Sequence, residues 1–204
     1  MSKFTGQGSR PNSILFWVLL LVAPGRSLAG ESDLVHFTLA DMDGDRDRDV
    51  VVARDGTISV LLNSGNASLM ATAPISATQV SRVAAGDING DGLPDVASLQ
   101  QNLGTLVVHL NSGNGQIASG TSFVVGGDPS AIALIDLDRD RDLDIAVTRR
   151  AAGDVFLWFN DGTSLFPLSA TVTVGATPHL LLPSDIDRDG FPDLVVFHDT
   201  QPPR

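Results

Sequence analysis

The chain has 204 residues, a formal net charge of −11 and no cysteine. That length allows one or two domains, and the lack of cysteine excludes a disulfide scaffold. The acidic balance argues against a nucleic-acid-binding protein, because affinity for phosphate backbones comes largely from lysine and arginine. Of the 24 acidic residues, 23 are aspartates. Aspartate favours turns over helices, and its short carboxylate suits compact oxygen sites for cations.

The amino-terminal segment has the pattern of a secretory signal peptide. Lys3 and Arg10 precede the ten-residue apolar run ILFWVLLLVA, and a small-residue segment ends at Ala29. We therefore predict a signal peptide over 1–29 and a secreted mature chain over 30–204 that acts outside the cell, at its surface or in the periplasm. Ten apolar residues are too few to span a membrane as a helix, and no later segment is long enough. An uncleaved anchor and a buried hydrophobic segment are the alternatives.

Four similar segments recur along the rest of the chain, with their first residues 46, 49 and 49 positions apart. They read DMDGDRDRDVVVA from Asp41, DINGDGLPDVASL from Asp87, DLDRDRDLDIAVT from Asp136 and DIDRDGFPDLVVF from Asp185. The segments SVLLNSGNA from Ser59, VVHLNSGNG from Val107 and VFLWFNDGT from Val155 keep step with them. A period of this length indicates one supersecondary unit per repeat.

Each repeat contains signals for four short strands. In the second repeat, apolar runs at 82–86 and 95–99 flank the aspartate-rich segment, a run at 103–110 ends in an Asn-Ser-Gly turn, and another lies at 121–125. The third repeat has equivalent runs at 131–135, 144–148, 155–159 and 171–174. Such runs, rich in Val, Ile, Leu and Thr and bounded by turn residues, are typical of strands. Four strands in 40 to 50 residues are typical of a β-propeller blade.

The repeats supply about three and a half blades. We place complete blades at about 33–76, 80–125 and 130–174, and only the first two strands of a fourth at 179–204. The prediction is an all-β chain of blades with four antiparallel strands, forming an incomplete propeller, because known propellers use about four to eight blades. The open blade edges would be covered by another chain, by further sequence or by an unusual closure, and self-association is one such closure.

Oxygen-bearing side chains fall at positions one, three, five and nine of four aspartate loops, 41–49, 87–95, 136–144 and 185–193. Alternate residues of a tightly curled loop point toward one centre, and calcium accepts six to eight oxygens at flexible angles. Magnesium demands stricter octahedral geometry, and transition metals favour the cysteine and histidine that the loops lack. We therefore predict calcium sites with a carbonyl ligand at position seven. The side-chain ligands are Asp41, Asp43, Asp45, Asp49, Asp87, Asn89, Asp91, Asp95, Asp136, Asp138, Asp140, Asp144, Asp185, Asp187, Asp189 and Asp193.

The aspartate loops together carry 17 acidic residues and five arginines, a local charge of −12. Carboxylates this close repel one another or take up protons unless a cation lies between them. Solvated turns helped by arginine pairing are the alternative. Position six is Gly92 or Gly190 in loops two and four but Arg46 or Arg141 in loops one and three. A sharp turn there favours positive φ, so we expect loops two and four to bind calcium more tightly.

The motifs DINGDGLPDVA, DIDRDGFPDLVV, VLLNSGN and VVHLNSGNG, with Gly-x-x-Pro segments at Gly126 and Gly175, resemble FG-GAP or VCBS-type repeats. These are the blades of integrin α-subunit propellers and of many secreted proteins. The resemblance covers nearly all of the chain after the signal peptide. It implies calcium in the hairpin between the first and second strands of a blade, at the sixteen positions above. Arg46 and Arg141 depart from the glycine of the family pattern, as does the small number of blades.

No catalytic constellation stands out, since none of the four histidines lies in a nucleophile motif with serine or cysteine. Trp158 is expected in the core and not stacked on a sugar. We therefore expect a secreted, calcium-binding, non-catalytic module that recognises an extracellular protein or carbohydrate, with no nucleic-acid partner and no membrane span in the mature chain. The alternative is a fragment of a larger secreted enzyme or carbohydrate-binding lectin whose active part lies beyond Arg204.

Overall fold

The computed structural model describes residues 36–54, 56–65, 68–77 and 79–199, so the predicted signal peptide lies outside the described residues. Within these ranges the chain forms fifteen β-strands and one turn of 3-10 helix, and no α-helix. None of the described segments is a helix of the length and apolarity that crossing a membrane requires. The all-β prediction is confirmed.

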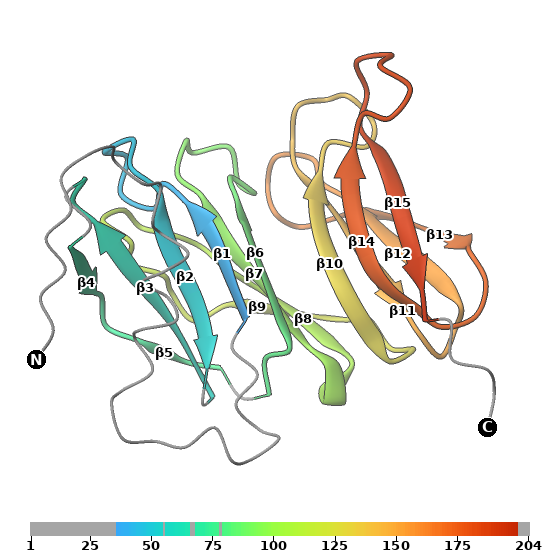
Figure 1. The fold of residues 1–204 in the computed structure, drawn as a ribbon, viewed down its shortest axis with the longest axis horizontal. Helices are drawn as coiled ribbons and strands as arrows, with labels where there is room; N and C mark the ends of the chain where they lie inside the picture. Colours follow the sequence, from blue (N-terminus) through green and yellow to red (C-terminus); the bar gives the residue numbers. More distant parts are fainter. Residues whose placement is uncertain (1–35, 55, 66–67, 78, 200–204) are drawn as a thin grey trace, which may run out of the picture.

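The strands form four antiparallel sheets that follow one another in chain order (Figure 1). The first sheet contains β1 (His36–Ala40), β2 (Asp49–Arg54), β3 (Thr57–Asn63) and β4 (Leu69–Ala71), with β5 (Ile75–Ser76) also paired to β3. The second contains β6 (Arg82–Gly86), β7 (Asp95–Gln100), β8 (Thr105–His109) and β9 (Thr121–Val124). The third contains β10 (Pro129–Ile135), β11 (Asp144–Arg149), β12 (Asp154–Phe159) and β13 (Leu168–Thr173). The fourth is a pair, β14 (Pro178–Ser184) and β15 (Asp193–His198).

The strands lie close to their predicted positions, and β6 has the predicted bounds. The clearest differences are at β13, which begins at Leu168 and not at Thr171, and at β8, which begins at Thr105 and not at Leu103. Residues Gln101–Leu103 form the 3-10 turn, and Gly104 ends it with φ 61°, the left-handed conformation that glycine adopts at little cost. This turn joins β7 to β8, so the apolar Leu103 belongs to the connection and is exposed.

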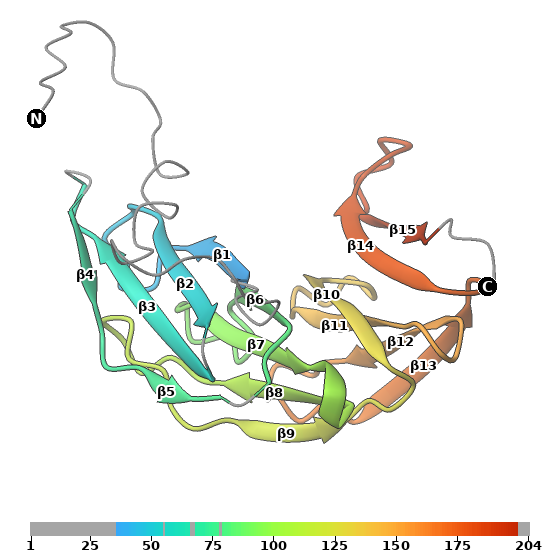
Figure 2. The same cartoon turned by 60° about the horizontal axis from the view of Figure 1, so that its bottom comes forward.

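The sheets are arranged face to face along an open arc, with the first strands β1, β6, β10 and β14 on its inner side (Figure 2). Each first strand contacts the first strand of the next sheet. Because every sheet is twisted and paired only with its own strands, neighbouring sheets are held together by side chains between them. The arrangement is that of consecutive propeller blades, and within the described residues the arc does not close into a ring.

Three apolar clusters lie between consecutive sheets and form the core. The first joins the first two sheets around Val51 and Val96, and the second joins the second and third around Leu99 and Ile145. The third joins the third and fourth sheets around Ala146 and Leu181. Trp158 lies in the second cluster, 7% exposed, so the prediction of a core role is confirmed. Burying this apolar surface supplies the main stabilisation between the blades.

Position two of the first three aspartate loops contributes a side chain to the cluster shared with the following sheet. Met42 and Ile88 are 0% and 1% exposed, and Leu137 packs on the third cluster. The equivalent Ile186 of the last loop is 61% exposed. An aspartate loop therefore also contains a packing residue for its neighbour.

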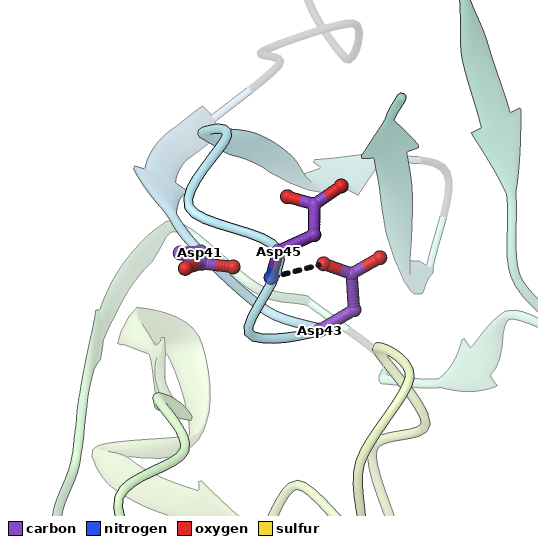
Figure 3. Close-up of side chains that lie close together, drawn as sticks. All are labelled: Asp41, Asp43 and Asp45. Atoms are coloured by element: carbon purple, nitrogen blue, oxygen red, sulfur yellow. Dashed lines mark hydrogen bonds between the residues drawn. The ribbon is translucent and has the colours of Figure 1, made fainter. Parts of the chain in front are cut away.

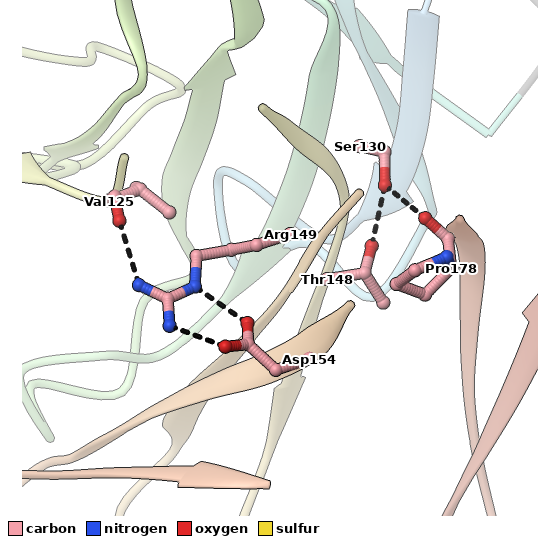
Figure 4. A network of polar contacts seen from close by, with 6 residues as sticks. All are labelled: Val125, Ser130, Thr148, Arg149, Asp154 and Pro178. Carbon is pink, nitrogen blue, oxygen red and sulfur yellow. Dashed lines mark hydrogen bonds and ion pairs between the residues drawn. The ribbon is translucent and has the colours of Figure 1, made fainter. Parts of the chain in front are cut away.

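Polar contacts supplement the apolar ones at the interfaces between sheets (Figure 4). Ser130 Oγ of the third sheet donates to the carbonyl of Pro178 in the fourth at 2.7 Å. Arg149 forms a bidentate ion pair with Asp154, with both contacts at 2.7 Å, and reaches the carbonyl of Val125 at 3.2 Å. A bidentate pair that is mostly buried fixes the guanidinium firmly, so this arginine anchors the segment that links the second and third sheets.

Replacing Ile88 by alanine is expected to lower the free energy of unfolding by about 2–5 kcal/mol, because it removes a buried side chain and leaves a cavity between two sheets. Chemical denaturation monitored by the fluorescence of Trp158, which packs in the same cluster, measures the loss. The control is Leu168→Ala on the exposed face of β13, expected to change stability by no more than about 0.5 kcal/mol. Equal losses in the two variants would contradict a core located between the sheets.

Candidate metal centre

Each aspartate loop is the hairpin connection between the first and second strands of one sheet. The last paired residues before the loops are Ala40 with Asp49, Gly86 with Asp95, Ile135 with Asp144 and Ser184 with Asp193. The strand register therefore brings position nine back beside the residue that precedes position one. All four loops therefore begin and end at the same position in the strand register, which is why their geometry repeats.

The carboxylate at position one curls the loop by accepting backbone N–H groups. In the first loop, Asp41 accepts the N–H groups of Gly44 and Arg46, both at 2.8 Å. Asp87 and Asp136 accept the N–H groups of positions four and six in the same way, at distances of 2.7–3.1 Å. In the fourth loop, Asp185 accepts from Gly190 at 3.1 Å. These local bonds satisfy backbone donors that have no strand partner.

Positions three and five continue this pattern along the loop. Asp43 accepts the N–H of Asp45 at 3.2 Å (Figure 3), and the carboxylate at position five accepts the N–H of position seven at 2.8–2.9 Å in all four loops. Asn89 plays the part of Asp43 in the second loop, accepting the N–H of Asp91 at 3.1 Å. An amide oxygen is thus sufficient for the local fold at position three, so a carboxylate there is not needed for the turn.

Positive φ angles occur at both position four and position six of every aspartate loop. The values are 82° and 76° for Gly44 and Arg46, 75° and 88° for Gly90 and Gly92, 74° and 81° for Arg139 and Arg141, and 63° and 88° for Arg188 and Gly190. A non-glycine residue in this region costs about 1–2 kcal/mol. The loops therefore share one conformation, and the third loop carries two strained residues where the second carries none. From the sequence, positive φ is expected only at position six.

Position nine is a buried carboxylate that holds three pieces of backbone together. Asp49, Asp95 and Asp144 are fully buried. One oxygen of each accepts the N–H of position two at 2.6–3.0 Å, and the other accepts the N–H of the asparagine that ends or follows the third strand, at 2.8 Å. Burial raises the pKa of all three carboxyl groups, partly offset by these hydrogen bonds. Among the described residues, the exposed carboxylate of Asp193 accepts only the N–H of Ile186, at 3.0 Å.

Two of the asparagines contacted by position nine also connect neighbouring sheets, a role that the sequence pattern, which indicates only turn residues, does not predict. Asn111 Nδ2 in the second sheet donates to the carbonyl of Met42 in the first loop at 2.9 Å. Asn160 Nδ2 in the third sheet donates to the carbonyl of Ile88 in the second loop at 2.6 Å. The one available signal was that asparagine recurs at this place in the three repeats that have a third strand.

The predicted ligands come together to different extents in the four loops. Three carboxylates lie with oxygens within 4.8 Å of one another in each of loops one, three and four: Asp41, Asp43 and Asp45; Asp136, Asp138 and Asp144; and Asp185, Asp187 and Asp193. In loop two, Asn89 Nδ2 donates to Asp91 Oδ2 at 3.0 Å, which brings these two predicted ligands together. The side-chain atoms that could bind a metal at these positions are carboxylate oxygens and the amide oxygen of Asn89. A set of oxygen ligands fits a hard cation such as calcium.

A serine and a histidine are in contact inside the second sheet, and no sequence motif indicates this contact. Ser98 Oγ lies 3.0 Å from His109 Nε2, and His109 Nδ1 lies 3.2 Å from the carbonyl of Ala118. Both side chains are buried, and burial lowers the pKa of His109. A pair enclosed in this way satisfies polar atoms of the core and offers no surface to a substrate.

Comparison with known proteins identifies both the repeat and the architecture. A model of the FG-GAP-like repeat matches residues 41–98, 87–147 and 136–196. The fold is similar to an Agrocybe aegerita lectin whose structure concerns recognition of non-reducing terminal N-acetylglucosamine, with a TM-score of 0.60 and 19% identity over 81% of this chain and 47% of the lectin. It is also similar to the Photorhabdus luminescens Tc holotoxin pore, with a TM-score of 0.55 and 16% identity over 78% of this chain and 8% of that chain.

The chain spans less than half the length of either structure. No curated protein sequence matches it significantly. Both structural similarities have low sequence identity, so they establish the architecture, and the repeat match rests on the aspartate loops and the strands around them.

Replacing Arg46 by glycine is expected to raise the free energy of unfolding by up to about 1 kcal/mol in the absence of metal, because glycine adopts a φ of 76° without the side-chain clash. The matched control is Arg48→Gly, which removes the same charge from the same loop at a residue without positive φ. That change is expected to lower stability by about 0.5–1 kcal/mol. Urea denaturation with chelator measures both, and equal effects would contradict backbone strain at position six.

Proposed function

Because the chain belongs to the FG-GAP-like repeat family, we propose that it is a secreted, calcium-stabilised and non-catalytic β-propeller module that recognises a ligand outside the cell. The observation that carries the calcium part is the convergence of carboxylates in loops one, three and four. The recognition part is supported by the propeller architecture, which the chain shares with a lectin and with a toxin component.

The aspartate loops suit calcium because their own hydrogen bonds already position the oxygens. Positions one, three, five and nine would supply carboxylate or amide oxygens, and position seven its carbonyl. Each carboxylate oxygen that accepts one N–H retains a second lone pair for a cation. A bound calcium ion supplies positive charge that offsets the repulsion between these carboxylates. The pKa of Asp142 is raised by desolvation and by the nearby Asp140 and Asp136, which reflects this crowding.

Secretion is supported by the signal-peptide pattern at 1–29 and by the association of the family with extracellular proteins. Calcium at extracellular concentrations is high enough to fill sites of modest affinity. A chain without cysteine gains no stability from disulfides, so bound metal and packing between blades would have to provide it. The three parts of the proposal are therefore physically consistent with one another.

A non-catalytic role is supported by how the polar groups are distributed. The Ser98–His109 pair is enclosed in the second sheet, and the clustered carboxylates occur in repeated loops instead of one unique cleft.

An open cleft of about 650 Å³ lies between the β11–β12 turn and the segment before β14, lined in part by Asp128, Arg150 and Thr177. Its mixed charges and hydroxyl groups suit a polar ligand, such as a carbohydrate or a protein side chain.

The alternative is that the chain is part of a larger secreted enzyme or lectin. Its fold matches only 47% of the similar lectin chain, which favours a larger assembly around these blades. A screen of the secreted protein against immobilised glycans, with and without calcium, separates the two ideas. Binding by this chain alone would support an independent recognition module, and binding only when further blades are supplied would support the alternative.

Adding calcium to the secreted protein is expected to raise its thermal unfolding midpoint, because a ligand that binds only the folded state stabilises it, by about 4 kcal/mol per site at a thousand times Kd. Magnesium at the same concentration is expected to raise it less. The proposal fails if the midpoint is the same in calcium and in chelator.

Asp187→Asn tests whether the loop carboxylates are responsible. The amide oxygen is expected to go on accepting the N–H of Asp189, as Asn89 does for Asp91, so stability without metal should change little. The number of calcium ions bound, or the affinity of one of them, is expected to fall in isothermal titration calorimetry. The control is Asp199→Asn, which removes one charge outside the loops and should leave calcium binding unaltered. Equal losses in both variants would point to general electrostatic attraction.

A further inference from the structure

The described sheets are joined by a contact with two complementary halves. The forward half is position two of an aspartate loop, which inserts its side chain into the next sheet and presents its carbonyl there. The receiving half is the asparagine of the next sheet, whose Nδ2 donates to that carbonyl. We call this two-part contact between consecutive sheets the joint. It occurs twice, between Met42 and Asn111 and between Ile88 and Asn160. Its geometry repeats because the aspartate loops and the third strands repeat.

The fourth sheet presents a forward half without a receiver. Ile186 is exposed, and among the described residues no donor bonds to its carbonyl. The apolar side chains Leu180, Leu182 and Phe197 are also exposed on this sheet. In the third sheet Ala133, the equivalent of Leu182, lies in the cluster shared with the fourth sheet. In the first and second sheets Ala53 and Leu99, the equivalents of Phe197, lie in the clusters shared with the following sheet. The exposed face of the fourth sheet therefore continues the series of interfaces between sheets.

The first sheet presents a receiving half without a forward partner. Asn63 Nδ2 donates to the carbonyl of Arg48 in its own loop at 3.2 Å. Asn111 and Asn160 make the equivalent bond within their own sheets, to Pro94 and Leu143, and add a second bond to the preceding loop. In the part of the chain that the structure describes, Asn63 has no such second acceptor. One amide hydrogen is left for a carbonyl in the position that Ile186 offers.

The first sheet also has an exposed apolar residue on the side where a preceding sheet would pack. Phe37 on β1 is exposed. Its equivalents by strand register, Val83 on β6 and Ile132 on β10, pack on the cluster shared with the preceding sheet. The first sheet therefore has one exposed apolar side chain and one polar donor at places that contact a preceding sheet in the later repeats.

We propose that two copies of this chain associate head to tail, with the fourth sheet of each packed on the first sheet of the other. Ile186 then occupies the place that Ile88 occupies between the second and third sheets, and Asn63 Nδ2 donates to its carbonyl. Two copies supply six sheets of four or more strands and two strand pairs, which together lie within the range of about four to eight blades that propeller rings use. A single copy matches 47% of the similar lectin chain, so two copies together have about the extent of one lectin chain.

The contact joins two different surfaces, so it generates either a closed ring or an open chain of subunits, depending on whether the rotation closes. The open arc of four sheets favours closure with two subunits (Figure 2). The proposal rests on the joint between sheets and does not depend on the identity of a ligand or on calcium. Its test is therefore separate from the test of the proposed function.

The experiment measures the mass of the secreted, processed protein by light scattering after size-exclusion chromatography, in calcium. The expected mass is that of two chains. Ile186→Asp alters the fourth sheet and Phe37→Asp alters the first, and each variant alone is expected to give single chains because a buried unpaired carboxylate disrupts the contact. The control is Val124→Asp on β9, an exposed position away from both faces, which should keep the two-chain mass. Circular dichroism checks that all three variants remain folded.

Mixing the two single-chain variants tests directly whether the fourth sheet of one chain binds the first sheet of another. One intact fourth sheet and one intact first sheet remain in the mixture, so a two-chain species is expected to reappear with one joint in place of two. A two-chain mass for Phe37→Asp alone would mean that fourth sheets pair with each other, and would overturn the proposal. A wild-type protein that is a single chain would also overturn it, as would a series of larger species, which indicates a non-closing contact.

Discussion

The fold depends on a buried aspartate that accepts two backbone N–H groups. A carboxylate removed from water is costly unless its oxygens are bonded, and Asp49, Asp95 and Asp144 meet this condition with one donor from the start of the loop and one from the end of the third strand. This single side chain closes the hairpin between strands one and two and fixes the end of strand three against it. The blade is thereby locked at one end, and the remaining loop residues are free to arrange their oxygens.

Position two carries this constraint into the neighbouring sheet. The N–H of Ile88 is bonded to Asp95, its carbonyl accepts from Asn160 in the third sheet, and its side chain lies in the core between the two sheets. A change in the loop therefore reaches the next blade through one residue. If calcium orders the aspartate loop, the same contacts transmit that order to the interface, which links metal binding to the stability of the whole arc. The aspartate loops hold 17 of the 24 acidic residues of the chain, so most of its negative charge lies beside these contacts.

The sequence was sufficient for the strands and the repeat, because both depend on local patterns. Alternating apolar runs and turn residues gave β6 its bounds, and the repeated aspartates located all four loops. The role of Asn160 was not predictable from local pattern, because its partner Ile88 lies 72 residues away in the sequence. The 3-10 turn before β8 was missed because Leu103 continues an apolar run. The contact between Ser98 and His109 was missed because it depends on the register of two strands.

Position nine holds the fold, whereas the carboxylate at position three is not needed for the turn and is available to a cation. The most direct test compares Asp144→Asn with Asp138→Asn by urea denaturation in the presence of chelator. Asparagine at position nine has one acceptor oxygen in place of two and leaves a buried N–H unpaired, so the free energy of unfolding is predicted to fall by about 2–4 kcal/mol. The change at position three is predicted to be no larger than about 0.5 kcal/mol. Equal losses in the two variants would contradict the central role of the buried aspartate.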